Sequence, residues 1–211
     1  MLIYGKDLYQ FSSHMSQIEL SFHQYLLLCD EPILIHTGNV QQAEAMIPQL
    51  KAILHGKDLS YIFISHFESD ECGGLAIILK QFPKARIVCS QTTAQQLLGF
   101  GLVDTVMIKK PGDRIKTNDY ELEFLSYPSE MHLWDGLLAV ELHRGIFFSS
   151  DLMMAFGAGT GIVKDSSWEK EVQSIRLEQV PDPEKLATLK QRLLSLSPQF
   201  VATGHGPCLK L

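Results

Sequence analysis

The stretch YIFISHFESDECGGL, Tyr61 to Leu75, decides how the rest of the chain is interpreted. Its apolar run from Tyr61 to Ile64 is typical of a buried strand, and Gly73-Gly74 permits a tight turn into a helix that begins near Leu75. Between them lie three potential metal ligands at every second position, which are His66, Glu68 and Asp70. The stretch therefore predicts either a metal site or a polar loop that follows a strand.

The spacing of these three residues limits how they can bind metal. In a continuing strand their side chains would spread over roughly 13 Å, which is too far for one ion. A loop that curls directly after Ile64 would bring His66 and Glu68 to one ion while Asp70 reaches a second, about 3.5 to 4 Å away. The alternative is that Asp70 caps the following helix and that His66 and Glu68 are solvated. The motif alone leaves both interpretations open.

Three more potential ligands follow predicted strands further along the chain. They are His132 after LEFLSY, Asp151 after GIFFSS and His205 after QFVATG. Each alone also fits an ordinary loop histidine, turn residue or partly buried histidine. Their joint occurrence favours one shared site, because open α/β sheets place their ligands at the ends of strands.

The remaining pattern predicts a single α/β or α+β domain over residues 1–211, with two packed sheets flanked by helices. Short apolar or alternating runs bounded by turn residues predict the strands. Helical spacing appears in five segments: Val40–Ile53, Gly73–Phe82, Thr92–Leu98, Trp168–Ile175 and Pro183–Leu196.

Composition excludes several classes of partner. A net charge of -6 argues against binding to nucleic acid or to an anionic membrane surface. The chain has no apolar run of membrane-spanning length and no secretory leader pattern, so we expect a cytoplasmic protein. Its four cysteines form no C-x-x-C pair, which argues against a thiolate zinc site and a disulfide framework.

The order H-x-E-x-D, His, Asp, His, with an early LIHTG, resembles the metallo-β-lactamase superfamily. It is most similar to the di-iron domain of the flavodiiron proteins and their flavin-free relatives, which bind or reduce oxygen or nitric oxide. The resemblance implies a four-layer αβ/βα sandwich and a head-to-tail homodimer. It also implies the ligand set: His66, Glu68 and His132 on the first iron, Asp70 and His205 on the second, and Asp151 bridging both.

Two features bear on the metal and on the electron supply. Zinc hydrolases of the superfamily carry H-x-H-x-D-H, whereas this chain has Glu68 at the second position, and oxygen-rich ligation suits iron or manganese better than zinc. The family motif ends in Asp-His, but here Glu71 follows Asp70; it could ligate the second iron, pair with a neighbour or point away. No phosphate loop for a flavin is present, so we expect no flavodoxin-like domain and a separate electron donor.

Four residues are candidates for the surroundings of the site. His36 replaces the aspartate of the superfamily's D-T-G turn, and either bonds near the site or only stabilises the turn. Met153, Phe156 and Trp134 either line a pocket for a small apolar gas or belong to the core.

The leading functional hypothesis is a non-haem di-iron protein that binds or reduces O₂, with NO or peroxide as alternatives. It would act either as a redox enzyme with a partner that donates electrons, or as a gas-sensing module without turnover. The rival is a dinuclear zinc or manganese hydrolase, in which a metal-bound hydroxide would be the nucleophile.

Overall fold

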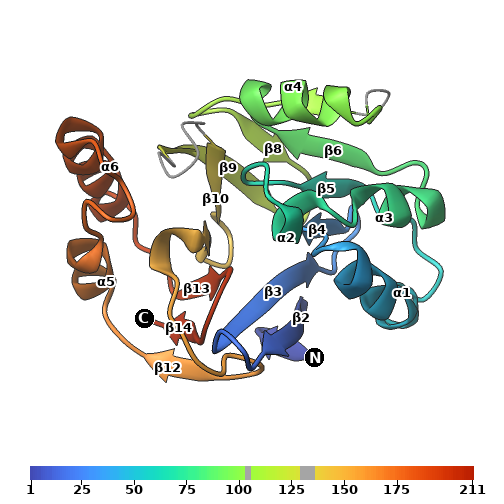
Figure 1. Cartoon of the computed structure of the whole chain (residues 1–211), viewed down its shortest axis with the longest axis horizontal. Helices are drawn as coiled ribbons and strands as arrows, with labels where there is room; N and C mark the ends of the chain where they lie inside the picture. The colour runs from blue at the N-terminus through green and yellow to red at the C-terminus, as the bar shows by residue number, and fades with distance from the viewer. Residues whose placement is uncertain (103–105, 129–135) are drawn as a thin grey trace.

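The computed structural model describes residues 1–102, 106–128 and 136–211, and within them two mixed seven-stranded sheets pack face to face (Figure 1). The first sheet has the order β1-β2-β3-β4-β5-β6-β7, antiparallel as far as β4 and parallel from β4 to β7. Its strands are Leu2–Tyr4, Leu8–Met15, Leu20–Leu27, Ile33–Ile35, Tyr61–Phe63, Arg86–Cys89 and Val106–Ile108.

The second sheet has the order β12-β14-β13-β11-β10-β9-β8. Its parallel pairs are β12 with β14 and β11 with β13, and the other neighbours are antiparallel. The strands β8 to β14 are Arg114–Lys116, Glu121–Tyr127, Gly136–Glu141, Ile146–Ser150, Val163–Asp165, Phe200–Thr203 and Cys208–Lys210.

Helices cover the outer face of each sheet (Figure 1). The first sheet carries α1 (Val40–Leu54), the short α2 (Ser69–Cys72), α3 (Leu75–Gln81) and α4 (Gln91–Gly99), and the second carries α5 (Trp168–Ser174) and α6 (Pro183–Leu194). Asn39 and Gln42 form a reciprocal capping box at the start of α1, and Asp182 caps α6 just before Pro183. The predicted helices are present, and their ends differ from the prediction by at most two residues.

Three apolar layers hold the sandwich together. Tyr25, Phe63, Phe124 and Phe148 belong to the layer between the sheets. A second layer joins the first sheet to α1, α3 and α4, and a third joins the second sheet to α5 and α6. The predicted four-layer αβ/βα architecture is therefore confirmed. In the described part of the chain, no helix is long and apolar enough to cross a membrane.

Several short or polar elements were not predicted. Half of the residues of strand β2, LYQFSSHM, are polar, so its sequence lacks a continuous apolar run. Its last two residues, His14 and Met15, are exposed. The three-residue strands β1, β8, β12 and β14 are shorter than a period-two pattern needs. The helix α2 has four residues and lies inside the ligand motif itself.

Gly74 sets the spacing between α1 and α3, on which the ligand loop rests. A Cβ atom at Gly74 would lie 2.3 Å from the Cβ of Ala43 and 3.1 Å from the carbonyl oxygen of Gly38. Its own N–H donates to that carbonyl at 2.7 Å. Only glycine fits this close approach, as the two-glycine turn predicts.

We expect Gly74→Ala to lower the free energy of unfolding by about 1 to 3 kcal/mol, because the added methyl forces apart two packed backbones. Gly99→Ala is the matched control, since a Cβ there meets nothing within 4 Å. Thermal unfolding of the two metal-free variants measures the difference. Equal melting temperatures would contradict the packing role of Gly74.

Candidate metal centre

The candidate ligands lie at one edge of the sandwich, where strands of both sheets end. Residues 64–68 follow β5 and lead into α2, which carries Asp70 and Glu71. Asp151 directly follows β11 and begins the 3₁₀ turn Asp151–Met153, and His205 follows β13. The parallel pair of β11 and β13 places Asp151 and His205 side by side.

Asp151 lies between two histidines and points a different oxygen at each. Its Oδ2 is 3.3 Å from Nε2 of His66, and its Oδ1 is 3.2 Å from Nε2 of His205. Each histidine also faces its own carboxylate: Glu68 Oε1 lies 3.3 Å from His66 Nε2, and Asp70 Oδ2 lies 3.5 Å from His205 Nε2. The structure thus forms two adjacent donor sets that share Asp151.

Glu71 completes both sets. Its side chain is 2% exposed, and its Oε2 lies 3.8 Å from Nε2 of His66. In each of two groups, His66 with Glu71 and Asp151, and Asp70 with Glu71 and His205, the ligand atoms lie within 4.8 Å of one another. Hydrogen bonds from Thr37, through N–H and hydroxyl at 2.8 and 3.1 Å, hold the backbone carbonyl of Glu71.

Asp70 does not cap a helix, contrary to the alternative interpretation of the motif. It lies inside α2, whose N-cap residue is Glu68, and α3 begins after Gly74 without a side-chain cap. The carboxylate of Asp70 is instead turned toward His205.

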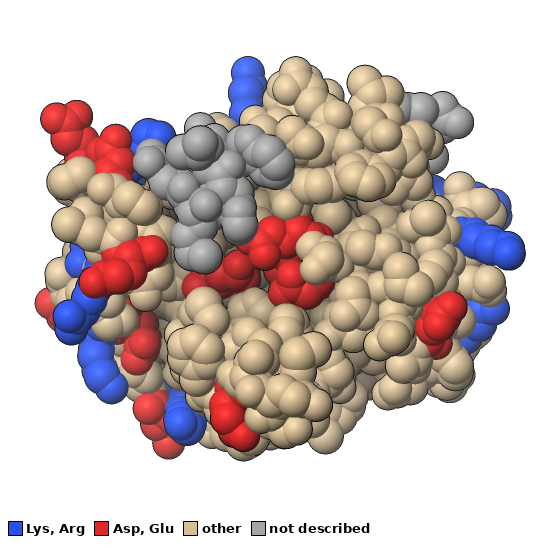
Figure 2. Space-filling view, viewed as in Figure 1, with Lys and Arg blue, Asp and Glu red and all other residues tan. Residues whose placement is uncertain are grey.

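The residues present fit a bound metal. His66 Nε2, Glu71 Oε2 and Asp151 Oδ1 are buried atoms that make no hydrogen bond. Leaving such groups unpartnered is costly, and cations would satisfy all three. Side-chain exposures of 30% for Glu68, 21% for Asp151 and 16% for Asp70 open the centre to solvent. Figure 2 shows acidic side chains gathered around a hollow in the middle of one face.

Crowding of carboxylates shifts the protonation of the centre. Burial, followed by the charge of Asp151, raises the pKa of Glu71 well above its usual range, and the same two causes raise the pKa of Asp70. Burial opposes the charged form of His66, but Glu71 and the other carboxylates outweigh it and raise the pKa of His66. Contacts with His205 and His66 outweigh burial at Asp151 and lower its pKa. Without cations the centre therefore takes up protons that offset its crowded carboxylates, and bound cations would take the place of those protons.

Both histidines are held through Nδ1, which leaves Nε2 directed at the carboxylates. His205 Nδ1 donates to the carbonyl oxygen of Ser21 at 2.9 Å. His66 Nδ1 lies 3.0 Å from the hydroxyl of Ser65 and 3.3 Å from that of Ser150. Metal-binding histidines characteristically donate their second ring N–H in this way. Sequence reasoning missed these partners, although a serine directly precedes both His66 and Asp151.

The remaining candidate residues from the sequence do not join the two donor sets in the described structure. His36 is buried and bonds to Ser65 at 2.8 Å. Met153 packs against the layer under α5 and α6, and Phe156 is 74% exposed. His132 and Trp134 lie outside the described residues.

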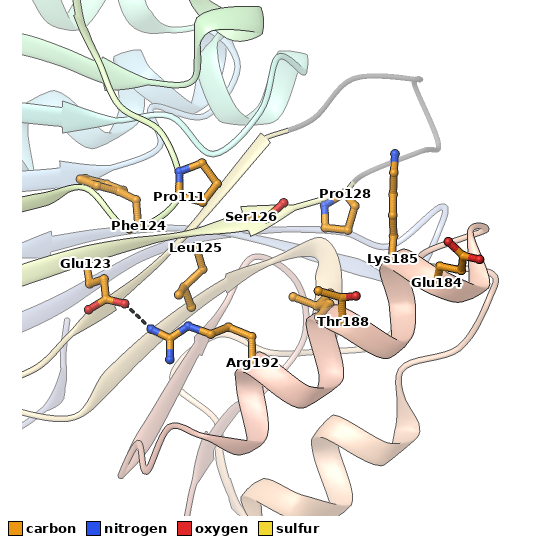
Figure 3. A pocket seen from close by; sticks show the side chains of 12 residues that line it. Pro111, Glu123, Phe124, Leu125, Ser126, Pro128, Glu184, Lys185, Thr188 and Arg192 are labelled. Carbon is orange, nitrogen blue, oxygen red and sulfur yellow. Dashed lines mark hydrogen bonds and ion pairs between the residues drawn. The ribbon is translucent and has the colours of Figure 1, made fainter.

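Of two hollows in the described structure, one lies away from the candidate ligands and the other lies beside them. A groove of about 550 Å³ runs between β9 and α6, where Arg192 pairs with Glu123, and none of the described candidate ligands lines it (Figure 3). A hollow of about 390 Å³ reaches Glu68 and Cys72 and is otherwise lined mainly by apolar side chains, among them Phe67, Leu97 and Phe100. The second hollow therefore adjoins the candidate metal centre.

Residues 20–206 match the model of a protein family described as "ODP family beta lactamase". The chain belongs to this family, which agrees with the metallo-β-lactamase fold predicted from its ligand order.

A nitric oxide reductase of Moorella thermoacetica is 26% identical over 149 residues, which is 70% of this chain and 36% of the relative. Two solved structures share the fold. The flavodiiron core of Flv1 from Synechocystis has a TM-score of 0.78 at 21% identity, over 96% of this chain and 54% of that one. Rubredoxin oxygen:oxidoreductase from Desulfovibrio gigas also scores 0.78, at 16% identity, over 97% and 56%.

The chain spans about a third of the length of the curated relatives, 34% and 36% in two of them. The expected relation to the di-iron domains of flavodiiron proteins is confirmed.

Proposed function

We propose that the chain holds two iron ions and binds or reduces O₂, with NO or peroxide as alternative substrates. The observation that carries this proposal is the position of Asp151, whose two oxygens face His66 and His205 separately, each beside a further carboxylate. A carboxylate placed in this way can bind one ion with each oxygen. The known activities of the relatives support the choice of reaction, since one is named a nitric oxide reductase and another an oxygen oxidoreductase.

In this assignment His66 and Glu68 bind the first ion together with His132, which the family resemblance supplies. Asp70 and His205 bind the second, and Asp151 binds both. Glu71 is close enough to both donor sets to ligate either ion. Iron, when bound, supplies the electrons that reduce the gas, and the mixed histidine and carboxylate donors suit iron or manganese better than zinc.

The residues of this chain have three further roles. The carboxylates of Glu68, Asp70, Glu71 and Asp151 neutralise the charge of two divalent ions. Ser21 and Ser65 orient His205 and His66. The apolar hollow beside Glu68 offers a small uncharged gas a route from solvent to the centre.

We further propose that residues 1–211 form one di-iron domain, that it pairs with a second copy, and that another protein donates its electrons. The relatives support an electron donor, because one of them is named for rubredoxin. A protein that holds the gas without turning over would instead report it to a partner.

Metal analysis and gas consumption test the proposal together. Protein purified without oxygen should contain two irons per chain and should consume O₂ or NO when a chemical reductant is supplied. Two irons with binding but no steady-state consumption would identify a sensing module. Two zinc ions with cleavage of a model ester would contradict the proposal and favour the hydrolase.

A further inference from the structure

Three polar side chains lie behind His66, on the side away from the carboxylates. The hydroxyl of Ser65 is 3.0 Å from His66 Nδ1, 2.8 Å from the hydroxyl of Ser150 and 2.8 Å from Nε2 of His36. The hydroxyl of Ser150 is itself 3.3 Å from His66 Nδ1. Ser65 is therefore the common partner of the other three groups.

The direction of these hydrogen bonds follows from what His66 must do. Its Nε2 faces Glu68 and Asp151, so a cation bound there requires the ring proton to be on Nδ1. The Nδ1–H then donates to the Ser65 hydroxyl. A hydroxyl has one donor and two acceptor positions, so Ser65 can still donate to His36 or Ser150 and accept from the other. All three hydrogen bonds of Ser65 can therefore form at the same time.

Burial and backbone conformation set this group apart from an ordinary polar cluster. Ser65, Ser150 and His36 are 1%, 3% and 4% exposed. His36 and Ser150 have φ values of 62° and 48°, which lie in the left-handed region that residues other than glycine rarely adopt. Such conformations persist where the surrounding structure imposes them, frequently at functional sites. Burial also lowers the pKa of His36 to about 3, so this histidine is neutral and can accept a hydrogen bond.

We propose that Ser65 is a positioning residue that fixes the tautomer and the ring plane of His66 for metal binding, and that His36 acts on His66 through Ser65. The inference rests on the metal centre of the proposed function but not on its reaction with a gas. Loss of the Ser65 hydroxyl leaves the Nδ1 proton with only the longer contact to Ser150. The ring is then less well oriented toward the shared donor set.

Ser65→Ala tests this, with Ser149→Ala as the matched control. Ser149 is also fully buried and one residue from Ser150, but among the described residues its hydroxyl bonds only to the carbonyl oxygen of Ser150, at 3.4 Å. Zn²⁺ is the probe, because it is diamagnetic and redox-inert, and its affinity is measured by competition with a chelator. We expect Ser65→Ala to weaken Zn²⁺ binding about 10- to 100-fold and Ser149→Ala to leave it within about twofold. Melting temperatures of the metal-free variants show whether both retain the fold.

Nuclear magnetic resonance of the zinc-loaded protein measures the hydrogen bond of His66 directly, separately from any change in the stability of the fold. The Nδ1–H proton of His66 should exchange slowly with solvent in the wild type and in Ser149→Ala. It should exchange faster in Ser65→Ala, because only the longer contact to the Ser150 hydroxyl remains. An exchange rate in Ser65→Ala as slow as in the wild type would contradict the inference.

A double-mutant cycle tests the role of His36. His36→Asn tolerates the left-handed conformation, but its shorter side chain does not reach Ser65. If His36 acts through Ser65, the double variant binds Zn²⁺ as Ser65→Ala does, whereas independent effects would multiply. If the double variant loses Zn²⁺ affinity by the product of the two single losses, the role of His36 is refuted. If Ser65→Ala binds Zn²⁺ as tightly as the wild type, the role of Ser65 is refuted. A wild type that binds no metal refutes the proposed metal centre instead.

Discussion

Asp151→Ala is expected to bind less than half of the wild-type iron and to lose the near-ultraviolet absorption that the iron-loaded protein should gain in air. The reason is the position of the side chain between the two donor sets, at 3.3 Å from His66 and 3.2 Å from His205. Two cations at short range repel each other strongly, and the carboxylate between them offsets that repulsion. Its removal should therefore empty both positions together.

Two further variants show that this effect belongs to the shared carboxylate. Asp151→Asn keeps the shape but removes the charge, and it should lose iron as well. Asp165→Ala removes an exposed aspartate on β12 that belongs to neither group of candidate ligands, and it should keep the wild-type iron content. Iron per chain and the optical spectrum, before and after air, are the measurements. An Asp151→Ala protein with full iron and an unchanged spectrum would refute the bridging assignment.

Glu71→Gln is expected to stabilise the metal-free protein by about 1 to 3 kcal/mol at pH 8, because a carboxylate that is buried beside other carboxylates is costly to ionise. Burial and the charge of Asp151 raise the pKa of Glu71 in the folded state. A raised carboxyl pKa contributes stability that is complete below the unfolded-state value and is lost as pH rises through the folded-state value. The advantage of Glu71→Gln should thus be small at pH 4 and should grow with pH.

Chemical unfolding of both proteins in the presence of a chelator, at several pH values, measures this difference. The comparison reports Glu71 together with its effect on His66, whereas groups away from the site titrate alike in both proteins. A constant difference between pH 4 and pH 8 would show that the pKa of Glu71 is not raised in the folded protein. With iron bound, the wild type should instead be more stable than Glu71→Gln if Glu71 is a ligand, because the variant loses one charged metal ligand.

The candidate ligands that follow strands could be predicted from the sequence alone. His66, Asp151 and His205 each come directly or within two residues after a predicted strand, and the structure brings both histidines to Asp151. The orientation of Glu71 could not be predicted. Its neighbours Asp70 and Cys72 allow it to point inward or outward, and only the single turn of α2, held by Thr37, turns it toward the ligands.

The hydroxyl groups of Ser65 and Ser150 were not predicted for a similar reason. A serine near the end of a strand is common, and its role here depends on a contact between residues 85 positions apart, one after β5 of the first sheet and one at the end of β11 of the second. The strand β2 shows the same limit for the fold, because its partly polar sequence is stabilised by pairing along the whole of β3 rather than by its own pattern.

The most direct test of the two-ion centre is anomalous diffraction at the iron edge from crystals grown with ferrous iron in the absence of oxygen. The structure predicts two separate peaks, one beside His66 and Glu68 and the other beside Asp70 and His205, with the carboxylate of Asp151 between them. A single peak, or peaks away from Asp151, would contradict the account.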